Sequence, residues 1–416
     1  MSRVLDVYLH EHLVGKLSQD TYGRLQFQYD KDYAESPFAL AISLSMPIQL
    51  EPYEDSYTRA FFSGLLPDDI ARHRLARFLG ISEKNSFALL EIIGGECAGA
   101  LSLYPEGETL ILPKEEDIDI LDNNKLREIL DLLKRRPLLA GQDNLRLSLA
   151  GAQDKIAVTI IEGSIALVKG TTPTSHILKP LIEDIKDSVH NEYFCLALAR
   201  LMNIETPEAE IHWLGDTPYF LVKRYDRKIV SGKGINRLHQ EDLCQALGIL
   251  PELKYEREGG PSIASTLELL QKYSLQPAVD RIAFIQRVIF NFLIGNADAH
   301  GKNYSLLYTD RLPILAPAYD LLCTTIYPNL SNKMAMRIGG KYDPNTVFLR
   351  HWHQLVPDTT AAKKVLNKDL IKISKDCLNY AHTLKESLKG KGIFSPIFED
   401  ICQVIKKRSE HIVGQF

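Results

Sequence analysis

The chain has 416 residues, 45% hydrophobic and 25% charged, which leaves room for two or three globular domains, each with its own core. A net charge of −4 excludes a globally basic surface that would bind nucleic acid directly. Six scattered cysteines without a CxxC pair argue against a disulfide framework or a zinc site. With no signal-peptide core and no window long enough to span a membrane, we predict a soluble cytoplasmic protein.

The N-terminal part, residues 1–105, predicts a β-rich subdomain without candidate chemistry. Apolar alternation between residues 3 and 29 indicates strands. Helices are expected around residues 58–66 and from Ile70 to Leu79, where Gly80 ends the pattern. Residues 87–104 are consistent with a helix followed by a strand and a turn. A linker, residues 106–140, carries one further helix at 124–134 before Pro137.

The middle part, residues 141–230, predicts a small lobe built mostly from strands. Residues 146–149 and 156–161 read as the two arms of a hairpin around a small-residue turn, with a further strand at 165–168. The pattern continues with a short strand at 176–180, a helix at 191–201, and an antiparallel pair at 208–214 and 219–225. From about residue 240 helical patterns dominate, among them one from Ile282 to Ile294 and a helical tail from Ala361 to Val413, so residues 231–416 form the expected helical lobe. Strands followed by mostly helices predict a two-lobed α+β fold.

The stretch from Gly295 to Tyr304, Gly-Asn-Ala-Asp-Ala-His-Gly-Lys-Asn-Tyr, carries the strongest chemical signal. Asp298 and Asn303 are five positions apart, the offset between the base and the metal-binding Asn of kinase catalytic loops. Asp320 follows 17 residues after Asn303, beyond a short apolar run. Together they could accept a hydroxyl proton and hold Mg²⁺ on phosphates. The alternative is that an Asn/Asp/Gly-rich segment is only a turn between apolar runs.

Three further features precede this stretch in the order that a kinase requires. The turn at 150–155, Ala-Gly-Ala-Gln-Asp-Lys, has small residues that let backbone N–H groups approach phosphate, although a plain hairpin turn reads the same way. Lys179 lies on a strand where a kinase has its phosphate-binding Lys, and Glu192 in the next helix is its candidate partner. The strand that ends at 223–225 could present backbone groups to an adenine. The combined order favours a phosphotransferase.

The sequence also resembles the HipA-type serine/threonine kinases, the toxins of bacterial toxin–antitoxin pairs. The resemblance extends over most of the chain, including the β-rich N-terminal part. It rests on the segments Leu147-Ser-Leu-Ala-Gly-Ala-Gln-Asp-Lys155, His176-Ile-Leu-Lys-Pro180, Asn191-Glu-Tyr193, Gln240-Glu-Asp242, Gly295-Asn-Ala-Asp-Ala-His-Gly-Lys-Asn303 and Ala318-Tyr-Asp320.

This resemblance implies a role for each matching residue. Asp298 would be the catalytic base, and Asn303 and Asp320 would bind Mg²⁺. Ser148 matches the serine that family members autophosphorylate, which ejects the phosphate-binding loop and silences the enzyme. The residues expected to contact ATP are Ala150, Gly151, Ala152, Gln153, Asp154, Lys155, Lys179, Lys223, Arg224, Tyr225, His300, Gly301, Lys302, Asn303 and Asp320. One departure is Lys223, where the family has an acidic hinge residue, so only backbone contacts carry over there.

The resemblance also implies partners and a cellular effect. Family members phosphorylate an aminoacyl-tRNA synthetase, with glutamyl-tRNA synthetase the first candidate, and so halt translation and cause growth arrest or persistence. A small helix-turn-helix antitoxin of the HipB type neutralises them and binds operator DNA. Contact with DNA would therefore be mainly indirect, which the net charge of −4 permits.

Two other readings compete with an active kinase. Asp298 and His300 would share one face of a strand and could bind a metal as part of a metallohydrolase, but no HExxH or comparable set completes the site. Alternatively, a catalytically silent kinase-like chain could act only as a corepressor through a DNA-binding antitoxin. The presence of all the expected catalytic residues argues against this second alternative.

Overall fold

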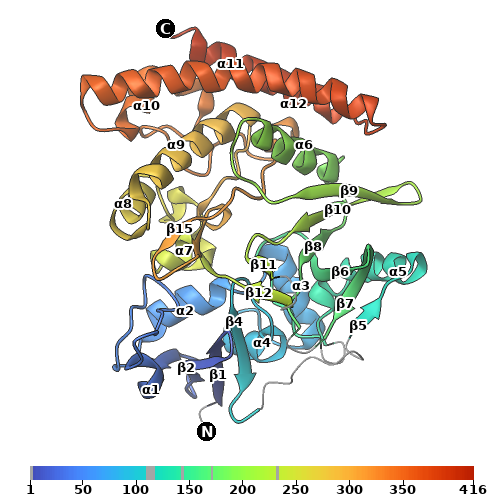
Figure 1. Ribbon diagram of the computed structural model, residues 1–416, viewed down its shortest axis with the longest axis vertical. Helices are drawn as coiled ribbons and strands as arrows, with labels where there is room; N and C mark the ends of the chain where they lie inside the picture. Colours follow the sequence, from blue (N-terminus) through green and yellow to red (C-terminus); the bar gives the residue numbers. More distant parts are fainter. Residues whose placement is uncertain (1–2, 109–117, 142–144, 170–171, 231–233) are drawn as a thin grey trace. The chain divides into compact units, whose positions relative to one another are not determined.

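The computed structural model describes residues 3–108, 118–141, 145–169, 172–230 and 234–416 (Figure 1). Contacts within the chain divide it into two compact units. Unit 1 comprises Met1–Pro180, His212–Glu252 and Ser305–Pro313. Unit 2 comprises Leu181–Ile211, Leu253–Tyr304 and Ile314–Phe416. The small-residue turn and Lys179 therefore belong to unit 1, whereas Asp298, Asn303 and Asp320 belong to unit 2.

The strands of the described residues form four sheets, ordered β3-β2-β1-β4, β5-β7-β6-β8-β10-β9, β11-β12 and β13-β14-β15. The strands are β1 (Arg3–Leu9), β2 (His12–Gln19), β3 (Leu25–Tyr29), β4 (Leu101–Pro105), β5 (Ile118–Ile120), β6 (Ile156–Ile161), β7 (Ser164–Val168), β8 (His176–Lys179), β9 (Ala209–Leu214), β10 (Thr217–Lys223), β11 (Arg227–Val230), β12 (Gly234–Arg237), β13 (His239–Asp242), β14 (Ser305–Tyr308) and β15 (Pro313–Leu315).

The helices lie before, between and after these strands. The α-helices are α1 (Lys31–Ala34), α2 (Asp55–Gly64), α3 (Asp69–Leu79), α4 (Ser86–Ile93), α5 (Asn123–Leu133), α6 (Ser188–Leu201), α7 (Leu243–Ala246), α8 (Ile263–Tyr273), α9 (Pro277–Ile294), α10 (Leu349–Trp352), α11 (Thr360–Gly390) and α12 (Ile397–Val413). The 3₁₀ turns are η2 (Pro137–Leu139), η3 (Pro251–Leu253), η4 (Glu256–Glu258), η5 (Gly301–Asn303), η6 (Thr324–Ile326), η7 (Pro344–Thr346) and η8 (His353–Leu355).

The β-rich start of the chain is confirmed. β1 pairs antiparallel with β2 and with β4, and the tight turn after β1 places His10 at φ 57°. Alternate residues of β3 are buried, as the apolar alternation predicted. The predicted helix at 70–79 is α3, and it ends at Gly80, which has a left-handed φ of 68°.

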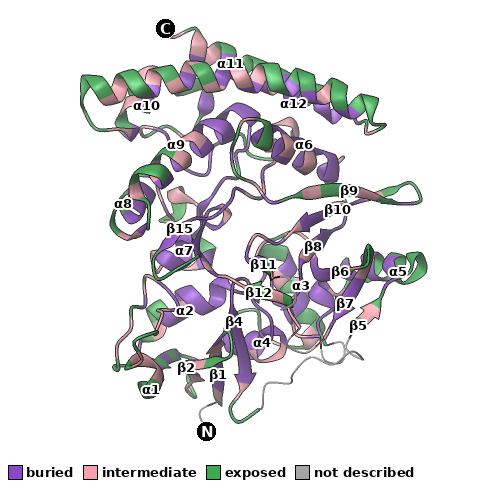
Figure 2. Cartoon of the chain, viewed as in Figure 1, coloured by how far each residue is buried: buried purple, intermediate pink, exposed green. Residues whose placement is uncertain are grey.

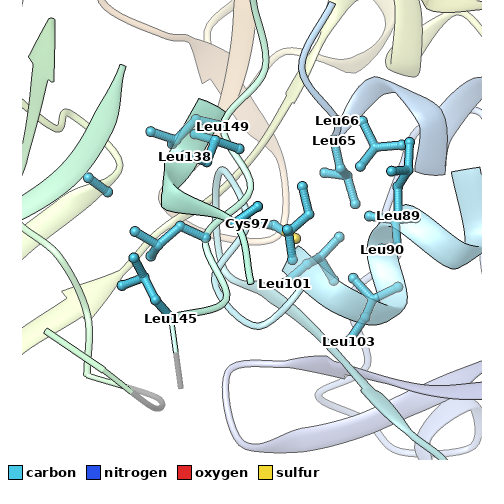
Figure 3. Packing of buried hydrophobic residues seen from close by; sticks show 14 of the residues in the cluster. Leu65, Leu66, Leu89, Leu90, Cys97, Leu101, Leu103, Leu138, Leu145 and Leu149 are labelled. Carbon is cyan, nitrogen blue, oxygen red and sulfur yellow. The ribbon is translucent and has the colours of Figure 1, made fainter. Parts of the chain in front are cut away.

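One apolar core of unit 1 joins the N-terminal sheet to the segment that carries Ser148. Figure 3 shows Leu65 and Leu66 beside Leu89 and Leu90, with Leu149 in the same cluster. Leu147 and Leu149 are 4% and 5% exposed. Burial of a Leu side chain stabilises a fold by about 1.5–3 kcal/mol, so these two leucines fix the segment on either side of Ser148. Most residues of α2, α4, β4 and β6 are buried (Figure 2).

The predicted hairpin across the turn at 150–155 is wrong. The strand β6 forms its hairpin with β7 instead, and its other neighbour is β8. The segment before the turn makes a single parallel bridge, between Leu147 and Glu96. The alternating apolar residues at 147 and 149 gave a strand-like pattern because they enter the core, not because they pair with β6.

Unit 2 is mostly helical. α11 and α12 lie side by side, as Figure 1 shows, and both contact α6 and α9. Phe194 of α6 stacks on Phe398 of α12 with ring centroids 4.9 Å apart. The predicted helical tail at 361–413 is two helices, because the chain turns at Gly392 (φ 76°) before α12 begins. The α9 helix starts at Pro277, five residues earlier than its apolar pattern indicated.

Across the described residues, no helix combines the length and the apolar character that crossing a membrane would require. All six cysteines are buried as free thiols.

Candidate active site

The segment that carries Asp298 begins where α9 ends. Gly295 closes the helix with a φ of 77°, and a Cβ at this position would overlap Thr325 and Val404. The carbonyl of Gly295 accepts the amides of Thr324 and Thr325 at 3.1 and 3.2 Å. The Thr324 hydroxyl in turn accepts the amide of Ala297 at 2.8 Å. This glycine therefore lets the chain leave the helix in close contact with the segment that follows Asp320.

Asp298 is the one exposed residue between Gly295 and Tyr304; Asn303 is partly buried and the others are buried. Its amide donates to the side-chain oxygen of Asn296 at 3.1 Å. Its carbonyl accepts the amide of His300 at 2.8 Å and the side-chain nitrogen of Asn303 at 3.0 Å. The backbone of Asp298 is thus fixed from both sides, while its carboxylate faces outward, where a proton acceptor has to be.

Asn303 and Asp320 supply oxygen atoms of the kind that Mg²⁺ prefers. Because the Asn303 nitrogen donates to the Asp298 carbonyl, the orientation of the amide is set and its oxygen points elsewhere. Asp320 has a φ of 56°, a left-handed conformation that is uncommon for a residue with a side chain. Such strain concentrates at functional sites. The preceding Tyr319 is held by a hydrogen bond from its hydroxyl to the Lys302 carbonyl at 2.7 Å.

His300 is 6% exposed and does not share a face with Asp298. Burial lowers the pKa of His300 to about 3, with Lys254 and Lys302 adding to the effect, so the ring is neutral near pH 7. Its Nδ1 atom is buried without a hydrogen-bond partner among the described residues. Nor does the described part of the chain contain a cluster of three or more His, Cys, Asp or Glu residues that could hold a metal. These findings give the metallohydrolase reading no support.

Tyr255 is a part of this site that the sequence did not reveal. Its hydroxyl donates to Oδ1 of Asp298 at 2.6 Å. The two residues are 43 positions apart, and Tyr255 lies beside a short 3₁₀ turn with no periodic pattern. Nothing in the spacing of residues could have found it.

The small-residue turn at 150–155 lies in unit 1 and is closed on itself. Gly151 has a φ of 106°, and a Cβ there would collide with the Lys155 ammonium. The Lys155 Nζ donates to the Ala150 carbonyl at 2.7 Å. The side-chain nitrogen of Gln153, Nε2, donates to the carbonyl of Pro180, the residue after Lys179, at 3.3 Å. A cavity of about 10 Å³ lies beneath the turn, lined in part by Pro67, Leu138 and Leu149.

Ser148, two residues before this turn begins, is fully buried. Its hydroxyl donates to the Leu65 carbonyl at 2.7 Å, and its amide donates to the Glu96 carbonyl at 2.9 Å. The hydroxyl therefore points into the protein and not toward solvent. A phosphate group could not be added here without moving the segment, because the hydroxyl is bonded to a carbonyl oxygen that would repel the phosphate.

Lys179 ends β8, opposite Phe220 of β10. It is 6% exposed, and its ammonium lies 5.9 Å from the centre of the Phe220 ring. Glu192, its predicted partner, is 2% exposed on α6. The two residues belong to different units, so their pairing stays a prediction.

The predicted hinge at 223–225 leaves β10 through a buried ion network. Arg224 is 3% exposed, and its guanidinium binds Asp226 at 2.9 Å and the Thr174 hydroxyl at 2.9 Å. Its amide donates to the Ser175 carbonyl at 2.9 Å. Both the side chain and the N–H group of Arg224 are thus used inside the fold. A ligand here would have to bind the carbonyl of Arg224 or the backbone of the neighbouring residues.

The network around Arg224 is centred on Glu96, a residue that no sequence motif singled out. The Glu96 carboxylate, 3% exposed, accepts the Thr174 amide at 2.9 Å and Arg227 at 2.9 Å. Although burial opposes ionisation, the guanidinium groups of Arg224 and Arg227 hold the pKa of Glu96 below its ordinary value. The carbonyl of the same residue accepts the Ser148 amide. Glu96 therefore connects the hinge to the segment before the turn.

Comparison with known proteins identifies the family. The HipA N-terminal domain model matches residues 5–104, and the HipA-like C-terminal domain model matches residues 147–383. The chain belongs to the HipA family of serine/threonine kinases. It is 30% identical over 383 residues to the serine/threonine-protein kinase toxin HipA of Shewanella oneidensis, covering 89% of this chain and 87% of that one.

Two further comparisons agree. The chain is 45% identical over 341 residues to Y4mE of Sinorhizobium fredii, a candidate kinase, with 81% of each chain covered. A solved structure of Shewanella oneidensis HipA with HipB and operator DNA matches with a TM-score of 0.81 at 26% identity, covering 99% of this chain and 96% of that one. The HipA-type chain described here thus has the kinase-like two-lobed α+β fold that the sequence predicted.

Proposed function

We propose that this chain is an ATP- and Mg²⁺-dependent serine/threonine kinase and the toxin of a HipA–HipB-type pair. The observation that carries the proposal is the loop in which Asp298 presents an exposed carboxylate while Asn303 bonds its backbone. In this arrangement Asp298 acts as the general base that receives the proton of the acceptor hydroxyl.

We assign the metal and nucleotide roles to residues of the same loop, to Asp320 and to residues of unit 1. Asn303 and Asp320 would hold Mg²⁺, which neutralises phosphate charge when bound. In unit 1, Lys179 would contact the phosphates, with Glu192 supporting it, and the backbone at 223–225 would lie along the adenine. The turn at 150–155 would cover the phosphates. The buried, unpartnered Nδ1 of His300 favours a ligand along 300–302.

Ser148 is the proposed site of autophosphorylation and self-inactivation. The supporting observation is its complete burial against the Leu65 carbonyl. Phosphorylated Ser148 cannot return to this position, since a dianion would replace a hydroxyl that donates to a carbonyl. The turn that begins two residues later would then be displaced from the phosphates, which silences the enzyme.

The partner and the target are proposed from the family. The structural relative is HipA bound to HipB and operator DNA, so we propose a HipB-like helix-turn-helix antitoxin, with DNA contacted mainly through it. The proposed substrate is an aminoacyl-tRNA synthetase, with glutamyl-tRNA synthetase tested first, in the cytoplasm. Its phosphorylation would inhibit translation and cause growth arrest or persistence.

The decisive experiment compares wild type with Asp298→Asn. Purified protein is incubated with radiolabelled ATP and Mg²⁺, alone and with a panel of aminoacyl-tRNA synthetases. Loss of the base should lower transfer by about 10²-fold or more, while the Kd for ATP changes less than about twofold. Asp216→Asn, at an exposed turn between β9 and β10, is the matched control and should transfer normally.

Two outcomes would contradict the proposal. Equal transfer by wild type and Asp298→Asn would remove the assigned base. Absence of label from wild type, and from Ser148→Ala supplied with the synthetases, would instead favour the silent corepressor. Phosphoproteomics of cells that express wild type or Asp298→Asn would then identify the target of the active enzyme.

A further inference from the structure

A tyrosine hydroxyl contacts the carboxylate of the proposed base. The Tyr255 phenol donates to Oδ1 of Asp298 at 2.6 Å, which is a short bond to a charged acceptor. Both residues belong to unit 2. Asp298 is exposed, so packing alone cannot fix its rotamer, and an exposed side chain changes rotamer on the picosecond-to-nanosecond scale. A hydrogen bond to one carboxylate oxygen restricts that motion.

The Tyr255 ring is itself held against the catalytic loop. It meets the His300 ring edge to face with centroids 5.1 Å apart. The Arg257 guanidinium lies 5.2 Å from the ring centre and the Lys254 ammonium 5.8 Å. The Lys254 carbonyl accepts the amide of Gly301 at 3.1 Å. The ring is thus held against the loop that carries Asp298.

The turn that carries Tyr255 is also anchored on its other side. The Glu256 carboxylate accepts the amide of Arg337 at 2.6 Å and pairs with its guanidinium at 2.7 Å. The amide of Glu256 donates to the Ala335 carbonyl at 3.2 Å. The Glu256 side chain is only 6% exposed, while that of Arg337 is 55% exposed, so the carboxylate is the buried end of this anchor. The position of the phenol is therefore set by contacts independent of Asp298.

We propose that Tyr255 is a positioning residue, whose hydroxyl fixes Oδ1 of Asp298 so that Oδ2 is directed to the acceptor hydroxyl. A carboxylate has two oxygens, and a base needs only one of them for the proton. The phenol keeps its own proton throughout: the acceptor proton moves to Oδ2 as the acceptor oxygen bonds to phosphorus and the bond to the leaving diphosphate breaks. This inference rests on the proposed function, because it assigns Asp298 as the base.

The test is Tyr255→Phe, which removes the hydroxyl but keeps the ring against His300 and Arg257. Single-turnover transfer of labelled phosphate is measured with the acceptor that wild type labels, over a range of ATP concentrations. The rate at saturating ATP should fall by about tenfold or more, since misplacing a catalytic group costs up to roughly 10²-fold. The half-saturating ATP concentration and the Tm should not change.

A matched control is Tyr33→Phe in unit 1. It also removes a phenol hydroxyl, one that donates to the Leu40 carbonyl and accepts its amide at 2.9 Å, and it should leave both kinetic constants unchanged. A saturated rate at or above wild type in Tyr255→Phe would overturn the inference, because the phenol would then be a competitor of the acceptor. A raised half-saturating ATP concentration together with a lowered Tm would also overturn the inference, because Tyr255 would then have a structural role. Wild type that transfers nothing would refute the proposed function itself, and this inference with it.

Discussion

Replacing Glu96 by Gln tests whether the buried ion network holds unit 1 together. The network contains two carboxylates, Glu96 and Asp226, and three guanidinium groups, Arg224, Arg227 and Arg237. Positive charges therefore exceed negative charges by one, and Glu96→Gln doubles that excess inside the protein. Removing one partner of a buried ion pair costs about 3–5 kcal/mol, because the remaining charge is left uncompensated.

Glutamine keeps an oxygen that can accept the Thr174 amide. Glu96→Gln should therefore lower the free energy of unfolding by about 3 kcal/mol, near the lower end of this range. The measurement is urea unfolding followed by circular dichroism. If the free energy of unfolding falls by roughly 3 kcal/mol per M of urea, the urea concentration at the unfolding midpoint should be about 1 M lower in the variant. Because the Glu96 carbonyl bonds the Ser148 amide, the variant should also make the segment at 147–155 more susceptible to proteolysis.

The control is Glu399→Gln, which makes the same chemical change in a half-exposed pair with Lys385 at 2.8 Å. Exposed pairs contribute about 0–1 kcal/mol. If the free energies of unfolding of the two variants differ by less than about 1 kcal/mol, the network contributes no more than a surface ion pair. That result would refute the expected cost of leaving a buried charge uncompensated.

Three further changes test other parts of the structure. Ser148→Asp should weaken ATP binding at least about tenfold in a nucleotide titration, whereas Ser148→Ala loses about 1 kcal/mol of stability and binds normally; equal affinities would contradict loop ejection. Burial raises the pKa of Glu241 to about 7, above its unfolded value, so its stabilising contribution is complete below about pH 4.5 and is lost as the pH rises through 7. The unfolding free energy of wild type relative to Glu241→Gln should thus fall by up to about 3 kcal/mol from pH 4.5 to 8, and parallel pH curves would disprove it. Gly295→Ala should cost more than about 1 kcal/mol, while Gly390→Ala, where a Cβ meets nothing within 4 Å, should not destabilise; similar Tm values for the two would show that the φ of 77° is not required.

Much of the fold could be predicted because it depends on local patterns. Alternation identified β3, helical spacing and Gly80 identified α3, and the strand that carries Lys179 was predicted to within one residue of β8. The hairpin across 150–155 was wrong because a buried irregular segment has the same apolar alternation as a strand. The spacing of apolar residues indicates which residues are buried, but not which elements they pack against.

By itself, the sequence determined the chemistry that lies within one short segment. Asp298 and Asn303 are five residues apart, so their contact through the Asp298 carbonyl is local and their spacing is informative. Only the tertiary structure decided which distant groups complete the site. Tyr255 reaches Asp298 across 43 residues, and Ser148 reaches Leu65 across 83. Such contacts leave no periodic signal, because they depend on how separate elements pack and not on the spacing of residues along one element.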